Sequence, residues 1–184
     1  MSKISINKYI EKKIDIPIFF SECSIDIKDT KDYFISRIEE SINSKNNNNF
    51  KTNVKGKMTS WNFFVNDQNF HSILNKGIEQ IEKFTKLRKS ILKEAWGIKI
   101  EKGDETYFHN HSECEFSGIL YLNNTELPIQ FPQLNINIVP NTGTLLFFSS
   151  ILTHGTNVNK LEQAKYAIPF NFYEVKDWIS SAKF

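Results

Sequence analysis

The second half of the chain is a succession of short β-like runs separated by turn residues, and this pattern limits the possible folds more than any other feature of the sequence. Strands this short and this closely spaced predict a β-sandwich or a barrel. A jelly-roll-like double sheet is the natural closure, because it hides most of the strand edges. The predicted strands are Ser90–Ile100, Thr106–His111, Phe116–Leu122, Leu127–Phe131, Leu134–Val139, Thr144–Ser150, Ile151–Thr156 and Lys165–Tyr173.

The first half predicts two helices that would pack on one face of this β structure. Asp29 or Thr30 can cap a helix that runs to about Ser44, because apolar residues recur there at helical spacing. A second apolar stripe predicts a helix over roughly Gln68–Leu87. Ile14–Cys23 reads as a strand ahead of both helices. The expected fold class is therefore mainly β with N-terminal helices.

The length of 184 residues is most simply one domain. Its expected parts are a strand and supporting helices over 1–89, a β core over 90–174 and a C-terminal tail over 175–184. A net charge of +2, with both signs scattered, predicts neither a nucleic-acid nor a membrane partner. Cys23 and Cys114 lack zinc-site or redox spacing. With no signal-peptide core, these features predict a cytoplasmic protein with reduced thiols.

His109 and His111 form an HxH pair at the end of a predicted strand. Residues two apart in a strand point to the same face, so both imidazoles would project together. Neutral imidazole is the commonest nitrogen ligand for transition metals, and two from one rigid strand would fix part of a coordination shell. An isolated HxH is more often just two polar residues near a strand end, so the pair needs support from elsewhere in the chain.

That support comes from His154, which follows a predicted turn at Pro140 and Gly143 and an apolar run over Leu145–Phe148. Alone, His154 could equally be a loop histidine or a ligand. Together with the HxH pair, it completes a face of three ligands. Three protein ligands with open positions left over suit iron or another transition metal that does chemistry, whereas a closed structural site would hold a fourth ligand.

The order of motifs resembles the 2-oxoglutarate/Fe(II)-dependent oxygenases. The motifs are HxH, then SG-x-x-YL over 117–122, P-x-x-G-x-LL-x-F-x-S-x-x-x-H over 140–154, a basic residue, and FN at 170–171. Within the superfamily, the chain is most similar to short, single-domain, prolyl-hydroxylase-like oxygenases of bacteria and phages. The resemblance covers about Ala95 to Phe172. It implies a distorted double-stranded β-helix of the jelly-roll, cupin-like kind, with N-terminal helices supporting the larger sheet.

The resemblance also implies residue roles. His109 and His154 take the places of the two histidine ligands of iron, and His111 stands where most of the superfamily has Asp or Glu. Tyr121 and Lys165 match the residues that contact the distal carboxylate of 2-oxoglutarate. Most relatives carry Arg in place of Lys165, and a lysine can meet that carboxylate only as a point charge, without a bidentate fork.

Two ligand sets remain open at this point. In the first, His109, His111 and His154 make a three-histidine site. In the second, the register is shifted so that His111 and Glu113 form an HxE pair completed by His154, with His109 nearby. Glu113 would lie beyond the predicted strand end, in a loop. The three-histidine site is therefore the prediction.

The activity implied is that of an oxygenase that uses Fe(II), 2-oxoglutarate and O₂ and releases succinate and CO₂. It would hydroxylate an amino-acid side chain of a protein or peptide, or a small molecule. The substrate would approach over Ser112–Glu115, Gly155–Gln163 and the Asn-rich loop Asn46–Asn49. Two alternatives remain, namely a three-histidine dioxygenase that does not use 2-oxoglutarate and a non-catalytic jelly-roll module that binds a metal or ligand. Cellular location would be the bacterial cytoplasm, or that of an infected host cell if a phage encodes the protein.

Overall fold

A computed structural model describes residues 18–44, 53–83 and 89–175 of the chain. Seven strands form a large antiparallel sheet in the order β1-β10-β7-β11-β5-β3, with β4 also pairing with β11. Both helices precede β4 in the sequence. The elements are β1 (Phe20–Ser24), α1 (Lys31–Ile42), β2 (Val54–Lys55), β3 (Lys57–Met58), α2 (Gln68–Ile81), β4 (Ser90–Ala95), β5 (Ile98–Ile100), β6 (Glu105–Thr106), β7 (Phe116–Tyr121), β8 (Ile129–Phe131), the 3-10 helix η1 (Pro132–Leu134), β9 (Ile136–Ile138), β10 (Thr144–Ser149) and β11 (Lys165–Glu174).

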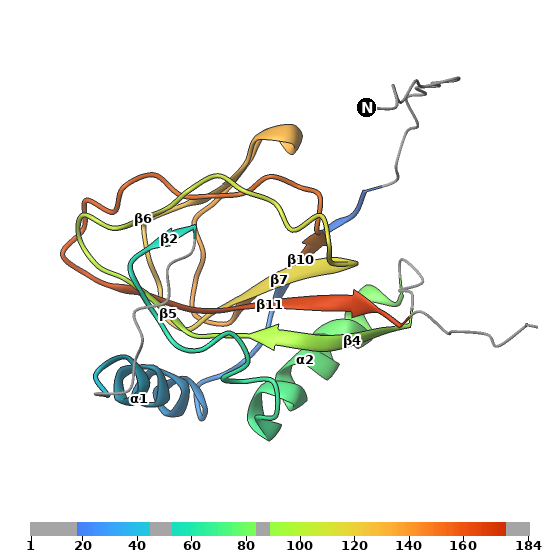
Figure 1. Cartoon of the computed structure of the whole chain (residues 1–184), viewed down its shortest axis with the longest axis horizontal. Helices are drawn as coiled ribbons and strands as arrows, with labels where there is room; N and C mark the ends of the chain where they lie inside the picture. Colours follow the sequence, from blue (N-terminus) through green and yellow to red (C-terminus); the bar gives the residue numbers. More distant parts are fainter. Residues whose placement is uncertain (1–17, 45–52, 84–88, 176–184) are drawn as a thin grey trace, which may run out of the picture.

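A second, smaller layer is built from two strand pairs, β2 with β6 and β8 with β9. The segment 154–156 joins them. On one side the Thr156 amide donates to the Thr106 carbonyl at 2.9 Å, and on the other Gly155 pairs with Gln130. In Figure 1, β2 and β6 lie on the opposite side of the large sheet from α1 and α2. The architecture is thus helices on a large sheet, with a smaller β layer on the sheet's other face.

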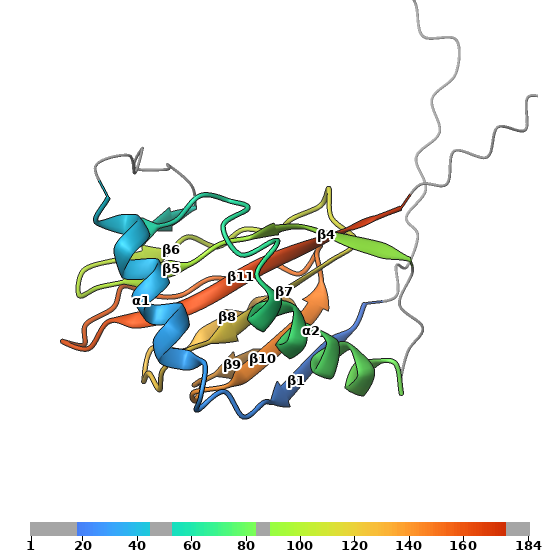
Figure 2. The ribbon, with the colours of Figure 1, turned by 90° about the horizontal axis from the view of Figure 1, so that it is seen from below.

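Helices α1 and α2 run across one face of the large sheet (Figure 2). Helix α2 begins where the Asp67 side chain accepts a hydrogen bond from the Phe70 amide at 3.0 Å, which satisfies a donor that the first helical turn leaves unpaired. Gly77 sits on its buried face. A Cβ there would come within 2.5 Å of Leu145 Cδ2, so glycine allows the helix to approach β10 closely.

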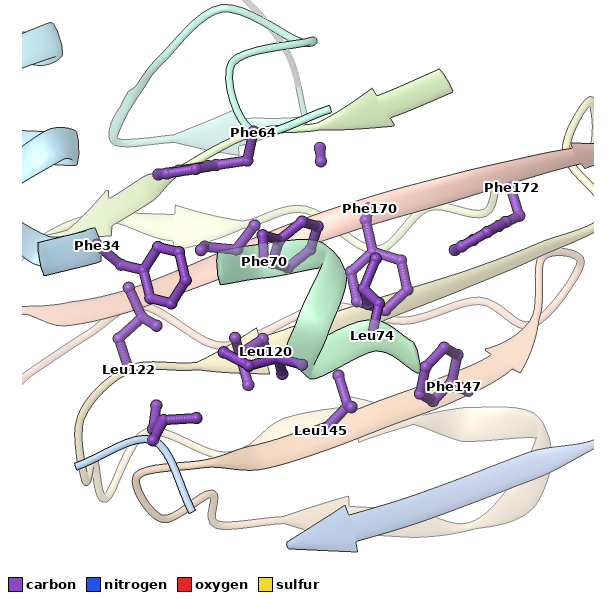
Figure 3. Close-up of a cluster of buried hydrophobic side chains, with 14 of the residues drawn as sticks. Phe34, Phe64, Phe70, Leu74, Leu120, Leu122, Leu145, Phe147, Phe170 and Phe172 are labelled. Atoms are coloured by element: carbon purple, nitrogen blue, oxygen red, sulfur yellow. The ribbon is translucent and has the colours of Figure 1, made fainter. Parts of the chain in front are cut away.

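Strand alternation divides the apolar residues of the large sheet between two cores. One core lies between the sheet and the helices, where Phe70 of α2 meets Phe170 of β11 with ring centroids 5.7 Å apart (Figure 3). The other lies between the two β layers and includes Ile119, Tyr121 and Phe148. Full burial of one such side chain stabilises the fold by about 1.5–3 kcal/mol. Both faces of the sheet are therefore buried, and the second core surrounds the interior in which the histidines lie.

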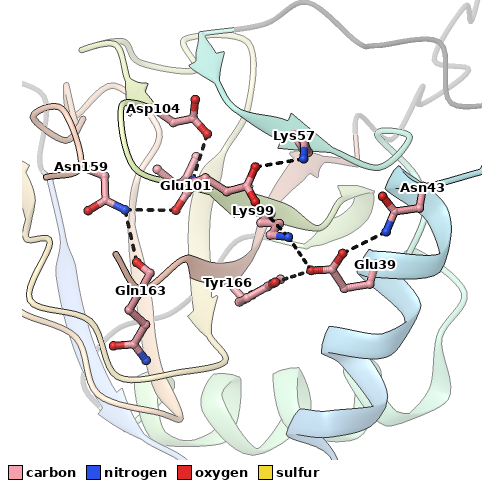
Figure 4. Close-up of polar contacts among 10 residues, drawn as sticks. Glu39, Asn43, Lys57, Lys99, Glu101, Asp104, Asn159, Gln163 and Tyr166 are labelled. Atoms are coloured by element: carbon pink, nitrogen blue, oxygen red, sulfur yellow. Dashed lines mark hydrogen bonds and ion pairs between the residues drawn. The ribbon is translucent and has the colours of Figure 1, made fainter. Parts of the chain in front are cut away.

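A polar network fastens α1 to the edge of the large sheet (Figure 4). The Lys99 Nζ lies 2.8 Å from the Glu39 carboxylate of α1 and 3.1 Å from Glu101, which also pairs with Lys57 at 2.9 Å. The Tyr166 hydroxyl donates to Glu39 as well. Burial alone would raise the pKa of Glu39, yet the hydrogen bonds from Lys99 and Tyr166 hold that pKa below its usual value. The network therefore strengthens as Glu39 ionises.

The fold class and the helix starts predicted from the sequence are confirmed, while several strand boundaries are wrong. Ser90–Ile100 is two strands, β4 and β5, separated by Gly97, where a Cβ would lie only 2.3 Å from the Ile38 side chain. Leu134–Val139 begins inside the 3-10 helix η1, which ends in a left-handed residue, Asn135. Apolar alternation does not reveal such backbone turns.

The two histidine-bearing segments are also not regular strands as predicted. Thr106–His111 contributes only the end of β6, and Ile151–Thr156 contributes isolated bridges at His154 and Gly155. Residues 14–17 of the predicted first strand and 84–87 of the predicted second helix lie outside the described residues. Within the described part of the chain, no helix combines the length and the apolar character that spanning a membrane requires.

We expect Glu39→Gln to lower the free energy of unfolding by about 1 kcal/mol at pH 7, because Lys99 then loses a charged hydrogen-bond partner. A carboxylate whose pKa is lowered on folding stabilises above its unfolded value, near 4.5, and that stabilisation is lost as the pH falls through the folded value. The difference from wild type, measured by urea unfolding, should therefore shrink towards pH 3. Glu40→Gln, an exposed neighbour on α1, serves as the control. An equal loss for Glu39→Gln at pH 7 and pH 3 would contradict the role of its charge.

Candidate metal centre

Three histidines converge between the two β layers. The backbones of His109 and His154 form an antiparallel bridge, with the His109 amide 3.1 Å from the His154 carbonyl and the reciprocal bond at 2.9 Å. The amide of His111 donates to the Ser150 carbonyl at 2.8 Å, which ties the third histidine to the strand before His154. Ring centroids lie 4.8 Å apart for His109–His111, 4.5 Å for His109–His154 and 5.3 Å for His111–His154.

Backbone carbonyls orient two of the three imidazoles. The Nδ1 of His109 lies 2.6 Å from the Tyr107 carbonyl, and the Nδ1 of His154 lies 3.0 Å from the Leu152 carbonyl. Since a carbonyl can only accept, each Nδ1 carries the proton and donates it. The Nε2 lone pair of each ring is then available to a metal, which is how histidine ligands are commonly held.

The environment keeps the three imidazoles neutral, the form that binds metals. Burial lowers the pKa of all three histidines, to about 4 for His111 and about 3 for His154, and their mutual proximity adds to the shift of these two. His154 is the most buried and lies against the rings of Phe131 and Phe148, at centroid distances of 5.8 and 4.8 Å. All three can therefore offer a lone pair at neutral pH and below.

The separation of the three rings suits a metal with a small inward movement. One ligand nitrogen from each histidine lies within 4.8 Å of the others. Imidazole nitrogens about 2.1 Å from one ion, on one face of an octahedron, are roughly 3 Å apart. Side-chain rotations could close that difference. No other group of three His, Cys, Asp or Glu side chains within the described residues is similarly placed.

Glu113, the carboxylate of the alternative ligand set, is not part of this group. It is exposed and lines two surface clefts, one of which His111 also borders. The imidazoles of His109 and His111 both line the inner cavity, so they project together as predicted. They do so without a regular strand: the His109–His154 bridge and the His111–Ser150 bond hold the two backbones. The fourth histidine, His71, lies on α2 with its Nε2 2.6 Å from the Val65 carbonyl, in keeping with a structural role.

An inner cavity of about 40 Å³ extends from the histidines towards Tyr121 and Lys165. The Tyr121 hydroxyl is fully buried and has no hydrogen-bond partner among the described residues, and burial raises its pKa. Lys165 is only 2% exposed, its Nζ lies over the Tyr121 ring at 5.4 Å, and burial lowers its pKa to about 8. Nowhere in the described chain does a carboxylate pair with Lys165. Lys165 and Tyr121, the two side chains predicted from the sequence, thus lie next to each other in the cavity wall. Together they offer a cation and a hydroxyl donor to a ligand that carries a hydrogen-bond acceptor.

Trp96 is a cavity residue that the sequence analysis missed. It lines the inner cavity, and within the described part of the chain its buried indole Nε1 has no hydrogen-bond partner. Trp96 belongs to the same core cluster as Ile98 and Ile100, at alternate positions along the chain. The alternation of Ile100, Ile98 and Trp96 could have predicted that Trp96 faces the interior. The sequence analysis instead treated 90–100 as a single strand and assigned no residue of it to the site.

Beyond the histidines lies a second hollow, which we call the mouth cleft, of about 290 Å³. His111 lines both the inner cavity and the mouth cleft, so it separates the two. Ser112–Cys114 border the mouth cleft as predicted, whereas Gly155 and Thr156 line the inner cavity instead, and Asn46–Asn49 lie outside the described residues. The mouth cleft is lined by Trp61, Glu94, Asn110, His111, Ser112, Glu113, Cys114 and Tyr173.

No protein-family model matches the sequence, and no curated protein matches it. Solved structures do match. A viral collagen prolyl hydroxylase from Paramecium Bursaria Chlorella virus-1, solved with 2-oxoglutarate, superimposes with a TM-score of 0.65 at 16% identity, over 85% of this chain and 96% of that one. A Pseudomonas putida prolyl-4-hydroxylase gives 0.65 at 13% identity, over 85% and 92%. HygX from Streptomyces hygroscopicus, solved with nickel and 2-oxoglutarate, gives 0.65 at 11% identity, over 85% and 83%.

These likenesses extend over most of both chains, so they concern the whole fold rather than one motif. They agree with the fold that the sequence resemblance implied, a jelly-roll core supported by N-terminal helices. The chain has the fold of the prolyl hydroxylases and of other 2-oxoglutarate-dependent enzymes.

Proposed function

We propose that the protein is an Fe(II)- and 2-oxoglutarate-dependent oxygenase. One observation carries the proposal. A buried lysine that pairs with no carboxylate of the described chain, and a buried tyrosine hydroxyl that has no hydrogen-bond partner there, share a cavity with three neutral, converging histidines. A metal would satisfy the histidines, and a carboxylate anion would satisfy Lys165 and Tyr121. A ligand that offers metal-binding oxygens at one end and a carboxylate at the other fits both demands, and 2-oxoglutarate is such a ligand.

His109, His111 and His154 are the proposed metal ligands. Three neutral nitrogens leave further positions open, as iron oxygenase sites do, although the usual facial triad contains a carboxylate. Bound iron, together with 2-oxoglutarate and O₂, would supply the oxidising chemistry and release succinate and CO₂. The chain itself would hold the metal, orient its ligands and exclude water. The carbonyls of Tyr107 and Leu152 fix two of the imidazole rings, and the rings of Phe131 and Phe148 shield His154.

Lys165 and Tyr121 are the proposed partners of the distal carboxylate. Burying an unpaired cation is costly, and here the cost appears as a lowered pKa. A bound carboxylate would restore the pKa of Lys165, while the Tyr121 hydroxyl would gain an acceptor. The inner cavity of about 40 Å³ has room for only a few water molecules. Co-substrate binding must therefore displace side chains around it, and the flexible lysine stem suits such a movement.

The structural neighbours support the same reading. The viral collagen prolyl hydroxylase was solved with 2-oxoglutarate, and HygX with nickel and 2-oxoglutarate. Two of the neighbours are prolyl hydroxylases, which supports a protein or peptide substrate for this chain as well. Cys23 and Cys114 are both free thiols, which is in keeping with a reducing, cytoplasmic location.

The first prediction concerns the metal ligands. Under anaerobic conditions, the protein should bind one equivalent of Fe(II), measured by chelator competition, and His154→Ala should abolish binding. His111→Ala should weaken binding at least a hundredfold, because only two nitrogens remain. Glu113→Ala should leave the affinity unchanged, and His71→Asn controls for the loss of a histidine elsewhere. Loss of binding in Glu113→Ala with retention in His109→Ala would instead establish the alternative ligand set, because His111 is a ligand in both sets.

The second prediction concerns Lys165. In the free protein its pKa is about 8, so binding of an anion above that pH requires proton uptake. The affinity for 2-oxoglutarate should therefore be nearly constant up to about pH 7.5 and then fall, by about fivefold from pH 8 to pH 9. Calorimetry in buffers of different ionisation enthalpy should show the accompanying proton uptake.

Lys165→Arg should remove this pH dependence, because the guanidinium stays charged over the whole range. Lys165→Met should weaken binding at every pH. Loading the protein with nickel in place of iron allows the affinity for 2-oxoglutarate to be measured without turnover. An affinity that falls by the same factor in wild type and in Lys165→Arg would show that the titrating group is not Lys165.

The third prediction concerns catalysis. Iron-loaded protein should slowly release succinate from 2-oxoglutarate even without its substrate, and the rate should require O₂. Lys165→Met should lower that rate at least tenfold at a fixed, subsaturating concentration of 2-oxoglutarate. A rate increase on adding peptides, larger than that produced by free amino acids, would support protein hydroxylation. Protein that binds both iron and 2-oxoglutarate, yet releases no succinate under any condition, would leave a binding module.

A further inference from the structure

A hydrogen-bonded polar row crosses three strands at the edge of the mouth cleft. Asn171 of β11 is the register partner of Ser117 on β7 and of Glu94 on β4. The Ser117 hydroxyl donates to Asn171 Oδ1 at 2.7 Å, and Asn171 Nδ2 donates to Glu94 Oε2 at 2.6 Å. Ser117 and Asn171 are 2% and 1% exposed. Only Glu94 reaches a cavity surface, where it lines the mouth cleft beside His111.

The row fixes the orientation of the Glu94 carboxylate. Because Ser117 donates to the amide oxygen of Asn171, the amide nitrogen is left facing Glu94. The register of β11 against β4 shifts directly after Asn171, between it and Phe172. Such bulges re-aim side chains and are common next to active sites. The fold therefore holds one carboxylate rigidly in the wall of the cleft that adjoins the histidines.

A purely structural role does not account for this arrangement. The register pair two positions earlier, Ile119 with Pro169, lies on the same face of the same two strands and is apolar. Apolar side chains at positions 117 and 171 would avoid the free-energy cost of desolvating two buried polar groups. Preorganised groups of this kind are instead characteristic of sites that bind a ligand.

The chemistry of the mouth cleft points to a cation. Its lining includes two carboxylates, Glu94 and Glu113, and the rings of Trp61 and Tyr173, and it includes no lysine or arginine of the described chain. Aromatic faces and carboxylates both attract cations. Burial raises the pKa of the Cys114 thiol, and the negative charges of Glu94 and Glu113 raise it further. Lys93 lies over the Tyr173 ring at 5.0 Å and lines an adjoining cleft that shares Tyr173 with the mouth cleft. The aromatic face left for a further cation is therefore that of Trp61.

We infer that the substrate carries a cationic group, a primary ammonium or a guanidinium, and that Glu94 receives it in the mouth cleft. The oxidised carbon would then lie next to the metal, since His111 borders the same cleft. Glu94 is thus a specificity-determining residue held in place by Asn171 and Ser117. The inference rests on the proposed function for the reaction, but the recognition itself can be tested by binding alone.

The test uses nickel-loaded protein with 2-oxoglutarate, and capped fluorescent heptapeptides whose central residue is Lys, Arg, Gln, norleucine or Glu. Fluorescence anisotropy at low ionic strength should show the Lys or Arg peptide binding at least tenfold tighter than the Gln and norleucine peptides. Capped single lysine and arginine, used as competitors, separate a small amine substrate from a peptide. Equal affinity of wild-type protein for the Lys, Arg and Gln peptides would overturn the inference without any variant.

Glu94→Gln keeps the hydrogen bond from Asn171 but removes the charge, and it should reduce the affinity for the cationic peptide to that of the Gln peptide. Glu126→Gln removes one charge at an exposed position that does not line the mouth cleft, and it should leave the affinity for every peptide unchanged. An unchanged preference in Glu94→Gln would overturn the inference. Failure of nickel or 2-oxoglutarate to bind in the preceding step would instead count against the proposed function, so the two failures are distinguishable.

Discussion

Two backbone hydrogen bonds between His109 and His154 bring the fold and the candidate site together. They link two segments 45 residues apart, neither of which is a regular strand at that point. The same bridge closes the smaller β layer and sets two imidazoles next to each other, with a centroid distance of 4.5 Å and the ring planes tilted by 50°. Because the backbone pairing fixes where the two rings start, only side-chain rotations separate this arrangement from a coordination shell, and such partial preorganisation favours metal binding.

The large sheet supplies the other half of the site through strand alternation. On β11, residues 166, 168 and 170 face the helix-packed core, which leaves Lys165, Ala167 and Pro169 on the interior face. The helices matter to the site because they cover the first face with Phe and Leu side chains, so that the sheet is stable enough to carry an unpaired lysine on the second. Proteins commonly accept such local instability at functional positions, where a ligand later compensates for it.

The sequence predicted most of the residues of the candidate site, but not the backbone contacts that bring them together. Motif spacing identified His109, His111, His154, Tyr121 and Lys165, and the structure brings all five to one cavity. It did not predict how the histidines converge, because a bridge between two irregular segments leaves no periodic signal. The Glu94 row was also missed: Glu94 and Asn171 are 77 residues apart, and their contact depends on strand register and a bulge, which local patterns do not encode. Trp96 was missed for a related reason, since the break at Gly97 was not anticipated.

The charges along the site form an ordered series. A buried cation, Lys165, and neutral imidazoles line the inner cavity, His111 borders both hollows, and the carboxylates of Glu94 and Glu113 line the mouth cleft. Opposite charges attract most strongly where water is excluded, so each end of the series favours a different partner. An anion such as 2-oxoglutarate is favoured at the inner end and disfavoured at the mouth, while a cation experiences the reverse. The two reactants of the proposed reaction are therefore directed to opposite sides of the histidines, with neither competing for the position of the other.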